Sequence, residues 1–166
     1  AAAMGVTVEY IKKRVESLCE HNPMLGHRGC RLGNTYPCIT QMQTRAILGA
    51  AIELKREGFD PHPEIMVPLT GILYEFEAQE KVIRDEAAAL FAEEGMEIPF
   101  KVGTMIEIPR AALTANRIAS RAEYFSFGTN DLTQMTFGYS RDDIASFLPV
   151  YLDKKILKVD PFQVLD

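Results

Sequence analysis

The sequence lacks the features that mark several large classes of protein. Its three cysteines are an odd number without C-x-x-C spacing, which excludes a disulfide framework or a cysteine zinc site and favours a reducing intracellular compartment. No apolar run approaches the roughly 18 residues of a membrane helix, and the first residues do not resemble a secretory signal. With a net charge of -5 and no basic stripe, neither nucleic acid nor an anionic membrane is expected as a partner.

Glycine-rich phosphate loops are also missing. Neither G-x-G-x-x-G nor G-x-x-x-x-G-K-[ST] occurs, so a nucleotide-binding doubly wound sheet has no local support. The composition, with 47% hydrophobic and 25% charged residues in 166, is that of a soluble globular domain with a sizeable core.

Hydrophobic periodicity predicts an alternation of helices and strands. We expect helices over 8–20, 36–57, 73–95, 109–120 and 142–151, with one or two further helical turns over 132–137. We expect strands over 24–33 (leading into a loop), 64–69, 100–108 and 124–127. This order predicts right-handed βαβ units and a parallel sheet. A (β/α)8 barrel needs roughly 250 residues, so four βα units make about half of one.

Two carboxylates stand out because each follows an apolar strand. Glu107 lies in the run 102–108, and Asp131 follows the run 124–128. At the carboxyl ends of consecutive parallel strands both side chains would face one cleft, where Mg²⁺ commonly takes one or two protein carboxylates. The alternatives are that Glu107 alternates onto a solvent face and that Asn130 or Asp131 caps the helix that follows.

Three arginines are candidates for binding an anion. Arg28 and Arg31 lie in a short glycine-flanked basic stretch, and Arg141 follows Asp131 by ten residues. Each could bind a phosphate or carboxylate in a bidentate manner. The alternatives are ordinary surface arginines and, for Arg141, an ion pair with a neighbouring aspartate. The three histidines have no metal-ligand spacing, and buried structural roles are expected for Cys30 and Cys38.

Four segments in register carry a resemblance to a known family. They are NPMLGHRGCRL (22–32), PEIMVPL (63–69), GTMIEIPRAAL (103–113) and FSFGTNDLTQMTFGYSRDD (125–143). Together they resemble the pyruvate, phosphate dikinases, which are PEP-utilising enzymes. The last two segments are shared with phosphoenolpyruvate synthase and with Enzyme I of the phosphotransferase system. The resemblance implies a leading helix over 1–21 and part of a PEP/pyruvate-binding TIM barrel over 22–166.

The family also implies specific ligands. By resemblance, Glu107 and Asp131 are Mg²⁺ ligands that chelate pyruvate or phosphoenolpyruvate. The substrate-contacting turn would comprise Gly128, Thr129, Asn130 and Asp131. Arg141 would contact the transferred phosphoryl group, and Arg28 would belong to the same pocket.

The implied reaction interconverts ATP, pyruvate and phosphate with AMP, phosphoenolpyruvate and pyrophosphate. None of the cysteines lies in the C-G-x-C-G-E-H-G-G-like context of the family's catalytic acid, and the phosphohistidine context is absent, so no catalytic residue is expected in this chain. The resemblance implies phosphohistidine and ATP-binding domains as partners, a homodimer, and a cytoplasmic location, with a plastid or glycosome as the alternative. A Mg²⁺-dependent pyruvate aldolase or citrate-lyase-type lyase is the alternative function.

Overall fold

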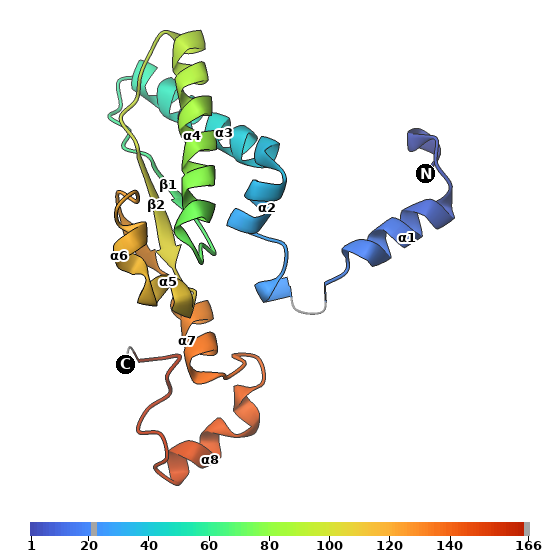
Figure 1. Ribbon diagram of the computed structural model, residues 1–166, viewed down its shortest axis with the longest axis vertical. Helices are drawn as coiled ribbons and strands as arrows, with labels where there is room; N and C mark the ends of the chain where they lie inside the picture. The colour runs from blue at the N-terminus through green and yellow to red at the C-terminus, as the bar shows by residue number, and fades with distance from the viewer. Residues whose placement is uncertain (21–22, 165–166) are drawn as a thin grey trace.

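The computed structural model describes residues 1–20 and 23–164 (Figure 1). The predicted boundary between the leading helix and the barrel part, at 21 and 22, falls on residues that the structure does not describe. The helices are α1 (Val8–Leu18), α2 (Cys30–Thr35), α3 (Pro37–Arg56), α4 (Leu73–Glu94), α5 (Pro109–Leu113), α6 (Ala115–Ile118), α7 (Thr129–Phe137) and α8 (Leu148–Asp153). The strands are β1 (Glu64–Val67), β2 (Lys101–Ile106) and β3 (Phe125–Phe127), and short 3-10 turns are η1 (Ala2–Met4), η2 (Pro23–Leu25) and η3 (Ile144–Ser146).

The three strands form a parallel sheet in the order β1-β2-β3. Ile65 lies opposite Val102, and Thr104 opposite Phe125. Each successive pair of strands is joined by helices, as parallel pairing requires. Among the described residues β1 and β3 each pair on one side only, so the sheet is open. This confirms the expected α/β class with part of a (β/α)8 barrel.

One face of the sheet is covered by α3 and α4 (Figure 1). Strand side chains alternate between faces, and those of Val67 and Val102 point into this covered side. The fully buried side chains opposite them are Leu48 and Ile52 of α3 and Phe76 and Ile83 of α4. The other face carries Met66 and Ser126, whose side chains contact each other. A barrel would enclose this second face, on which Met66 is 37% exposed in the described structure.

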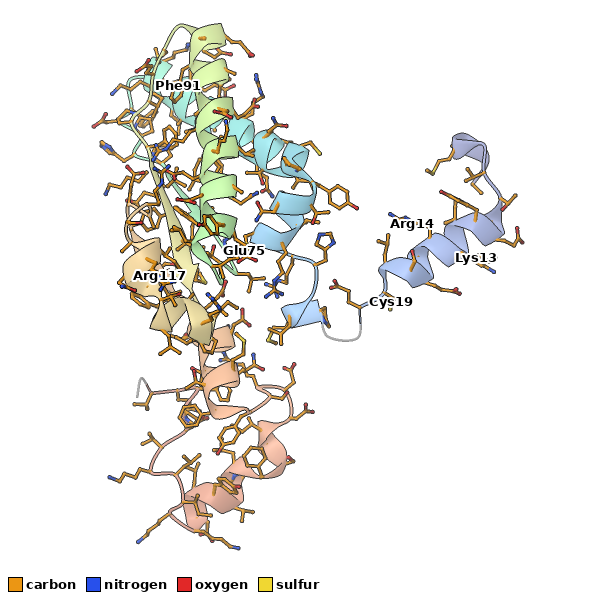
Figure 2. The ribbon with its side chains drawn as sticks, in the orientation of Figure 1. Lys13, Arg14, Cys19, Glu75, Phe91 and Arg117 are labelled. Atoms are coloured by element: carbon orange, nitrogen blue, oxygen red, sulfur yellow. The ribbon has the colours of Figure 1, made fainter. Side chains whose placement is uncertain are left out.

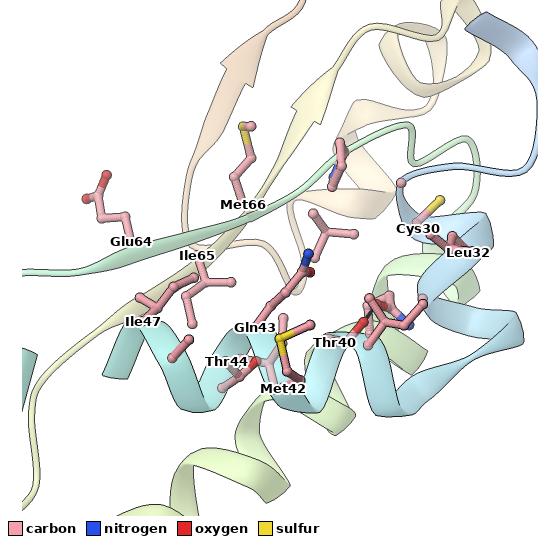
Figure 3. A pocket seen from close by; sticks show the side chains of 18 residues that line it. Cys30, Leu32, Thr40, Met42, Gln43, Thr44, Ile47, Glu64, Ile65 and Met66 are labelled. Atoms are coloured by element: carbon pink, nitrogen blue, oxygen red, sulfur yellow. Dashed lines mark hydrogen bonds between the residues drawn. The ribbon is translucent and has the colours of Figure 1, made fainter. Parts of the chain in front are cut away.

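A groove of 540 Å³ runs between β1 and α3 (Figure 3). Apolar side chains of both elements line it, among them Met42, Ile47 and Ile65. It lies along β1, and its end at Gly29, Cys30 and Pro68 reaches the carboxyl end of that strand. Neither Glu107 nor Asp131 lines it, so the groove is distinct from the predicted carboxylate site.

The first predicted strand, over 24–33, is wrong. These residues form the 3-10 turn η2 and the helix α2. The reversal occurs at Gly29, whose φ of 58° is left-handed and favours glycine. Arg31 Nη1 donates to the carbonyls of Leu25 and Gly26 at 2.6 and 3.0 Å, so a side chain satisfies groups that a strand would pair with a neighbour. Three βα units are therefore described, not four.

The start of α3 and the end of α4 lie at residues that are typical of helix ends. Pro37 occupies the first position of α3, where its missing N–H costs nothing, and Gly95 ends α4 in the left-handed conformation at φ 65°. The predicted helix over 109–120 instead breaks at Thr114, whose hydroxyl and N–H both donate to the Arg110 carbonyl, at 2.9 and 3.1 Å. The predicted helix over 142–151 divides before Pro149 into η3 and α8.

Helix α1 lies apart from the other elements, as the labelled side chains of Lys13 and Arg14 make clear (Figure 2). Thr7 caps it, because its hydroxyl accepts from the Tyr10 N–H at 3.1 Å. The helix is amphipathic as predicted, yet it has no buried residue. Over the described residues no helix has both the length and the apolar character needed to cross a membrane.

Candidate active site

Glu107 follows β2 at the carboxyl end of the sheet and is only 5% exposed. Its Oε1 accepts a hydrogen bond of 2.7 Å from the backbone N–H of Leu69, in the loop after β1. The alternative that Glu107 lies on a solvent face is therefore wrong. An acid buried to this degree needs a compensating partner, because removing a carboxylate from water is costly.

Asp131 lies in the first turn of α7 and is 9% exposed. The residue at the N-cap position is Gly128, and no side chain caps this helix. The alternative that Asn130 or Asp131 acts as the cap is therefore wrong. The helix dipole favours a carboxylate in the first turn. Because Asp131 is buried, its side chain points towards the sheet and not into solvent.

The two carboxylates lie close enough to affect each other. Burial raises the pKa of Glu107 above its usual value, and Asp131 raises it further. The Leu69 N–H and the charge of Arg28 act in the opposite direction. Two neighbouring buried acids disfavour simultaneous ionisation. A cation between them would reverse this effect, which is what a metal site supplies.

Gly128 leaves the room that this arrangement needs. A Cβ at Gly128 would lie 2.6 Å from both Cβ and Oε2 of Glu107. Thr129 and Asn130 follow it at the exposed start of α7 and line a groove of 360 Å³ shared with residues 161–164. The predicted turn over 128–131 thus combines one residue packed against Glu107, two exposed polar side chains and one buried acid.

The three candidate arginines make different interactions in the structure. Arg28 is exposed, and its charge reaches Glu107. Arg31 is bonded to its own loop through the Leu25 and Gly26 carbonyls and so fixes the turn that carries Arg28. The guanidinium of Arg141 lies 5.6 Å from the centre of the Phe162 ring, and its backbone N–H donates to Gln134 Oε1 at 2.9 Å. A contact of Arg141 with substrate stays a prediction.

The donor set matches a hard divalent cation that keeps water or substrate ligands. Among residues 1–20 and 23–164 no group of three or more His, Cys, Asp or Glu side chains is placed to hold a metal by itself. Glu107 and Asp131 supply two carboxylates, and Mg²⁺ commonly binds through one or two. Cys30 is buried, as predicted, and burial raises its pKa to about 11, whereas Cys38 is exposed, so the buried role predicted for Cys38 is wrong.

The sequence did not reveal the role of Leu69. It has a left-handed φ of 60°, which is uncommon for a residue with a side chain, and it is fully buried. Its contribution to the site is its backbone N–H, and a backbone donor leaves no mark in the side-chain pattern. The nearest signal was the position of 68–71 directly after an apolar strand, where barrel enzymes keep functional loops.

Comparison with known proteins gives a consistent assignment over nearly the whole chain. Residues 6–164 match the family described as PEP-utilising enzyme, PEP-binding domain. Pyruvate, phosphate dikinase of Mesembryanthemum crystallinum, named as chloroplastic, is 59% identical over 162 residues, covering 98% of this chain and 17% of the relative. The chloroplastic pyruvate, phosphate dikinase 1 of Arabidopsis thaliana is 59% identical over 166 residues, covering 100% and 17%.

A further relative is pyruvate, phosphate dikinase 2 of Zea mays, which is 57% identical over 162 residues, covering 98% of this chain and 18% of the relative. The chain thus spans about a sixth of the length of the relatives that it matches.

Proposed function

Because the chain belongs to the PEP-utilising enzymes, as their PEP-binding domain, we propose that it supplies the Mg²⁺ and enolate site of a pyruvate, phosphate dikinase. The observation that carries this proposal is the burial of Glu107 and Asp131 beside each other at the carboxyl ends of parallel strands. The intact protein would interconvert ATP, pyruvate and phosphate with AMP, phosphoenolpyruvate and pyrophosphate.

In this proposal Glu107 and Asp131 hold Mg²⁺. Their fit to the ion rests on the raised pKa of Glu107, which a bound cation would lower again. When bound, Mg²⁺ stabilises negative charge that develops on the substrate's enolate oxygen. The Leu69 N–H keeps Oε1 of Glu107 engaged and fixes the direction of the carboxylate.

The surrounding residues orient the three-carbon substrate. Gly128 leaves space beside Glu107, and Thr129 and Asn130 offer exposed hydroxyl and amide groups at the start of α7. Exposed N–H groups at the start of a helix favour an anion such as the substrate carboxylate. Arg28, whose charge already acts on Glu107, neutralises phosphoryl or carboxylate oxygens. Arg141 serves the phosphoryl group only when its guanidinium leaves the ring of Phe162.

The remaining chemistry belongs to other parts of the intact protein. A phosphohistidine accepts or delivers the phosphoryl group, and an acid protonates the enolate at carbon. Neither group is assigned to a residue of this chain, and the relatives are about six times longer. We also propose that the intact protein is a homodimer and lies inside the cell, in the cytoplasm or in an organelle such as a plastid.

The proposal is tested by calorimetric titration of the intact protein with Mg²⁺ in the presence of oxalate, an analogue of the pyruvate enolate. Glu107→Gln and Asp131→Asn should each weaken binding by about 100-fold, since each removes a charged ligand. The exposed acids Glu97 and Asp153 provide matched controls, Glu97→Gln and Asp153→Asn, which should bind as wild type does.

Unchanged binding in both site variants would refute the metal site. Cleavage of a carbon–carbon bond by the intact protein without any phosphoryl donor would favour a Mg²⁺-dependent pyruvate aldolase or citrate-lyase-type lyase. Phosphoryl transfer that needs no inorganic phosphate would favour phosphoenolpyruvate synthase, and transfer to a separate carrier protein would favour Enzyme I.

A further inference from the structure

The peptide group between Pro68 and Leu69 is bonded at both of its polar atoms. Its carbonyl, on Pro68, accepts from the backbone N–H of Cys30 at 3.0 Å. Its N–H, on Leu69, donates to Oε1 of Glu107 at 2.7 Å. A single planar unit therefore connects the start of α2 to the candidate metal ligand, and a shift at either end moves the other.

The turn before α2 is packed directly on this peptide. A Cβ at Gly29 would lie 3.0 Å from the Pro68 oxygen and 3.2 Å from Cβ of Leu69. Gly29 also has a left-handed φ of 58°. It is followed by Cys30, whose Sγ donates to the Leu69 carbonyl at 3.2 Å. Cys30 lies at the start of α2 beside the loop after β1 (Figure 3).

Leu69 has a backbone conformation that is unfavourable for a leucine in isolation. A leucine at φ 60° costs of order 1–3 kcal/mol and persists only where its surroundings fix it. Here the fixing contacts come from the turn at 29–30, on the segment that also carries Arg28. The left-handed backbone turns the Leu69 N–H towards Glu107.

We propose that Gly29 and Cys30 are positioning residues that hold the Pro68–Leu69 peptide, and through it Glu107, in the geometry that binds the metal. The inference rests on the proposed function, because the bond from the Leu69 N–H matters for metal binding only if Glu107 is a Mg²⁺ ligand. Partners of metal ligands typically change metal affinity 10- to 100-fold when they are removed. The same peptide couples the loop of Arg28 to the ligand, so both move together.

Gly29→Ala tests this inference, with Gly95→Ala as a control for replacing a glycine of positive φ. Gly95 has a φ of 65° and a Cβ there meets nothing within 4 Å, but its ψ of 23° suits alanine better than the ψ of -135° at Gly29. Both contact with the peptide and the greater backbone strain are therefore confined to Gly29→Ala, and both act on the turn that holds the peptide. The intact protein is titrated with Mn²⁺, followed by electron paramagnetic resonance, and amide hydrogen exchange of Leu69 is measured without metal. Gly29→Ala should weaken Mn²⁺ binding about tenfold or more and speed exchange at Leu69. Gly95→Ala should match wild type in both.

Equal Mn²⁺ affinity in Gly29→Ala and Gly95→Ala would overturn the inference while leaving the proposed function intact. A wild-type protein without Mn²⁺ affinity would overturn the proposed function, and exchange at Leu69 would still report whether Gly29 holds the peptide.

If Gly29→Ala does not fold, the thiol provides the second test. Cys30→Ala removes the bond to the Leu69 carbonyl, Cys30→Ser keeps a donor, and Cys38→Ala changes an exposed cysteine. Cys30→Ala should weaken Mn²⁺ binding severalfold, with Cys30→Ser close to wild type. Equal affinity in all three variants would overturn the inference.

Discussion

Glu80 and Glu107 are two acids buried almost equally but in opposite surroundings. Glu80, on α4, is 7% exposed, and its carboxylate accepts from Nη2 of Arg121 at 2.9 Å and lies 3.7 Å from Nε of Arg84. Glu107 is 5% exposed, and the charged groups that act on it are Asp131 and Arg28, of which Arg28 has the weaker effect. The first acid is neutralised by the fold, whereas the second is not.

We interpret the burial of Glu80 as structural and, under the proposed function, the burial of Glu107 as functional. Arg121 lies in the segment before β3, at the amino end of the sheet, which in barrel folds serves stability and not catalysis. Glu107 lies at the carboxyl end, where barrels place their active sites. Two acids buried together at that end lower the stability of the metal-free fold, and in the proposed function a bound cation would offset this cost.

Gly128→Ala should produce the largest effect, because it overpacks the region around Glu107. The added Cβ would lie 2.6 Å from Glu107 and 2.7 Å from the sulfur of Met105. We expect a loss of about 2 kcal/mol in stability together with weaker Mg²⁺ binding. Gly49→Ala is the control, since nothing lies within 4 Å of its Cβ in α3, and it should stabilise by up to about 1 kcal/mol. Urea denaturation measures both changes in stability. Equal stability of the two variants would contradict the close packing of position 128 against Glu107.

Glu80→Gln should produce the next largest effect by removing the charge that pairs with Arg121. Because the side chain of Arg121 is 53% exposed and keeps contact with water, the expected loss is about 1 to 2 kcal/mol. Mg²⁺ affinity should not change. Hydrogen exchange of the β2 amides measures the stability, and calorimetry the affinity. A loss of Mg²⁺ binding in this variant would break the distinction between the two acids.

Glu107→Gln should change stability in the opposite direction. The folded pKa of Glu107 is raised above its unfolded value of 4.5, so between these values the folded state binds more protons and stability falls as pH rises. Removing the charge should stabilise the metal-free protein near neutral pH by on the order of 1 kcal/mol. The amide oxygen can still accept from Leu69. Thermal unfolding from pH 4 to 8 is the measurement, and a destabilised variant at pH 7 would contradict the account.

Salt should produce the smallest effect. Arg84 and Glu123 form an ion pair with side chains 37% and 40% exposed, so 1 M NaCl should weaken it by about 0.5 kcal/mol. Glu123→Gln should remove this sensitivity while leaving an acceptor for the Val102 N–H. Comparison of unfolding in low and high salt tests the point. An unchanged salt response in the variant would show that other charges carry it.

The sequence predicted those parts of the fold where local and tertiary preferences agree. Pro37 and Gly95 marked the ends of α3 and α4, and the apolar runs around Ile65, Val102 and Phe125 became the three strands. The segment over 24–33 was misassigned because its conformation depends on distant contacts. Cys30 bonds to Pro68 and Leu69, and these bonds hold the start of a helix where a short stretch flanked by glycine and proline suggested a strand.

The candidate site was predicted to a similar extent. Burial of Glu107 and Asp131 follows from their places after strands, and the structure brings them together. The bond from the Leu69 N–H to Glu107 could not be predicted, because it depends on a left-handed backbone at a leucine. The contact of Arg141 with the Phe162 ring could not be predicted either, since the two residues are far apart in sequence.

The most direct test is a crystal structure of the intact protein soaked with Mn²⁺ and oxalate. The account predicts an anomalous peak about 2.1 Å from carboxylate oxygens of both Glu107 and Asp131, with the Leu69 N–H still bonded to Glu107. A peak bound by neither acid, or no peak near the carboxyl end of β2, would contradict it.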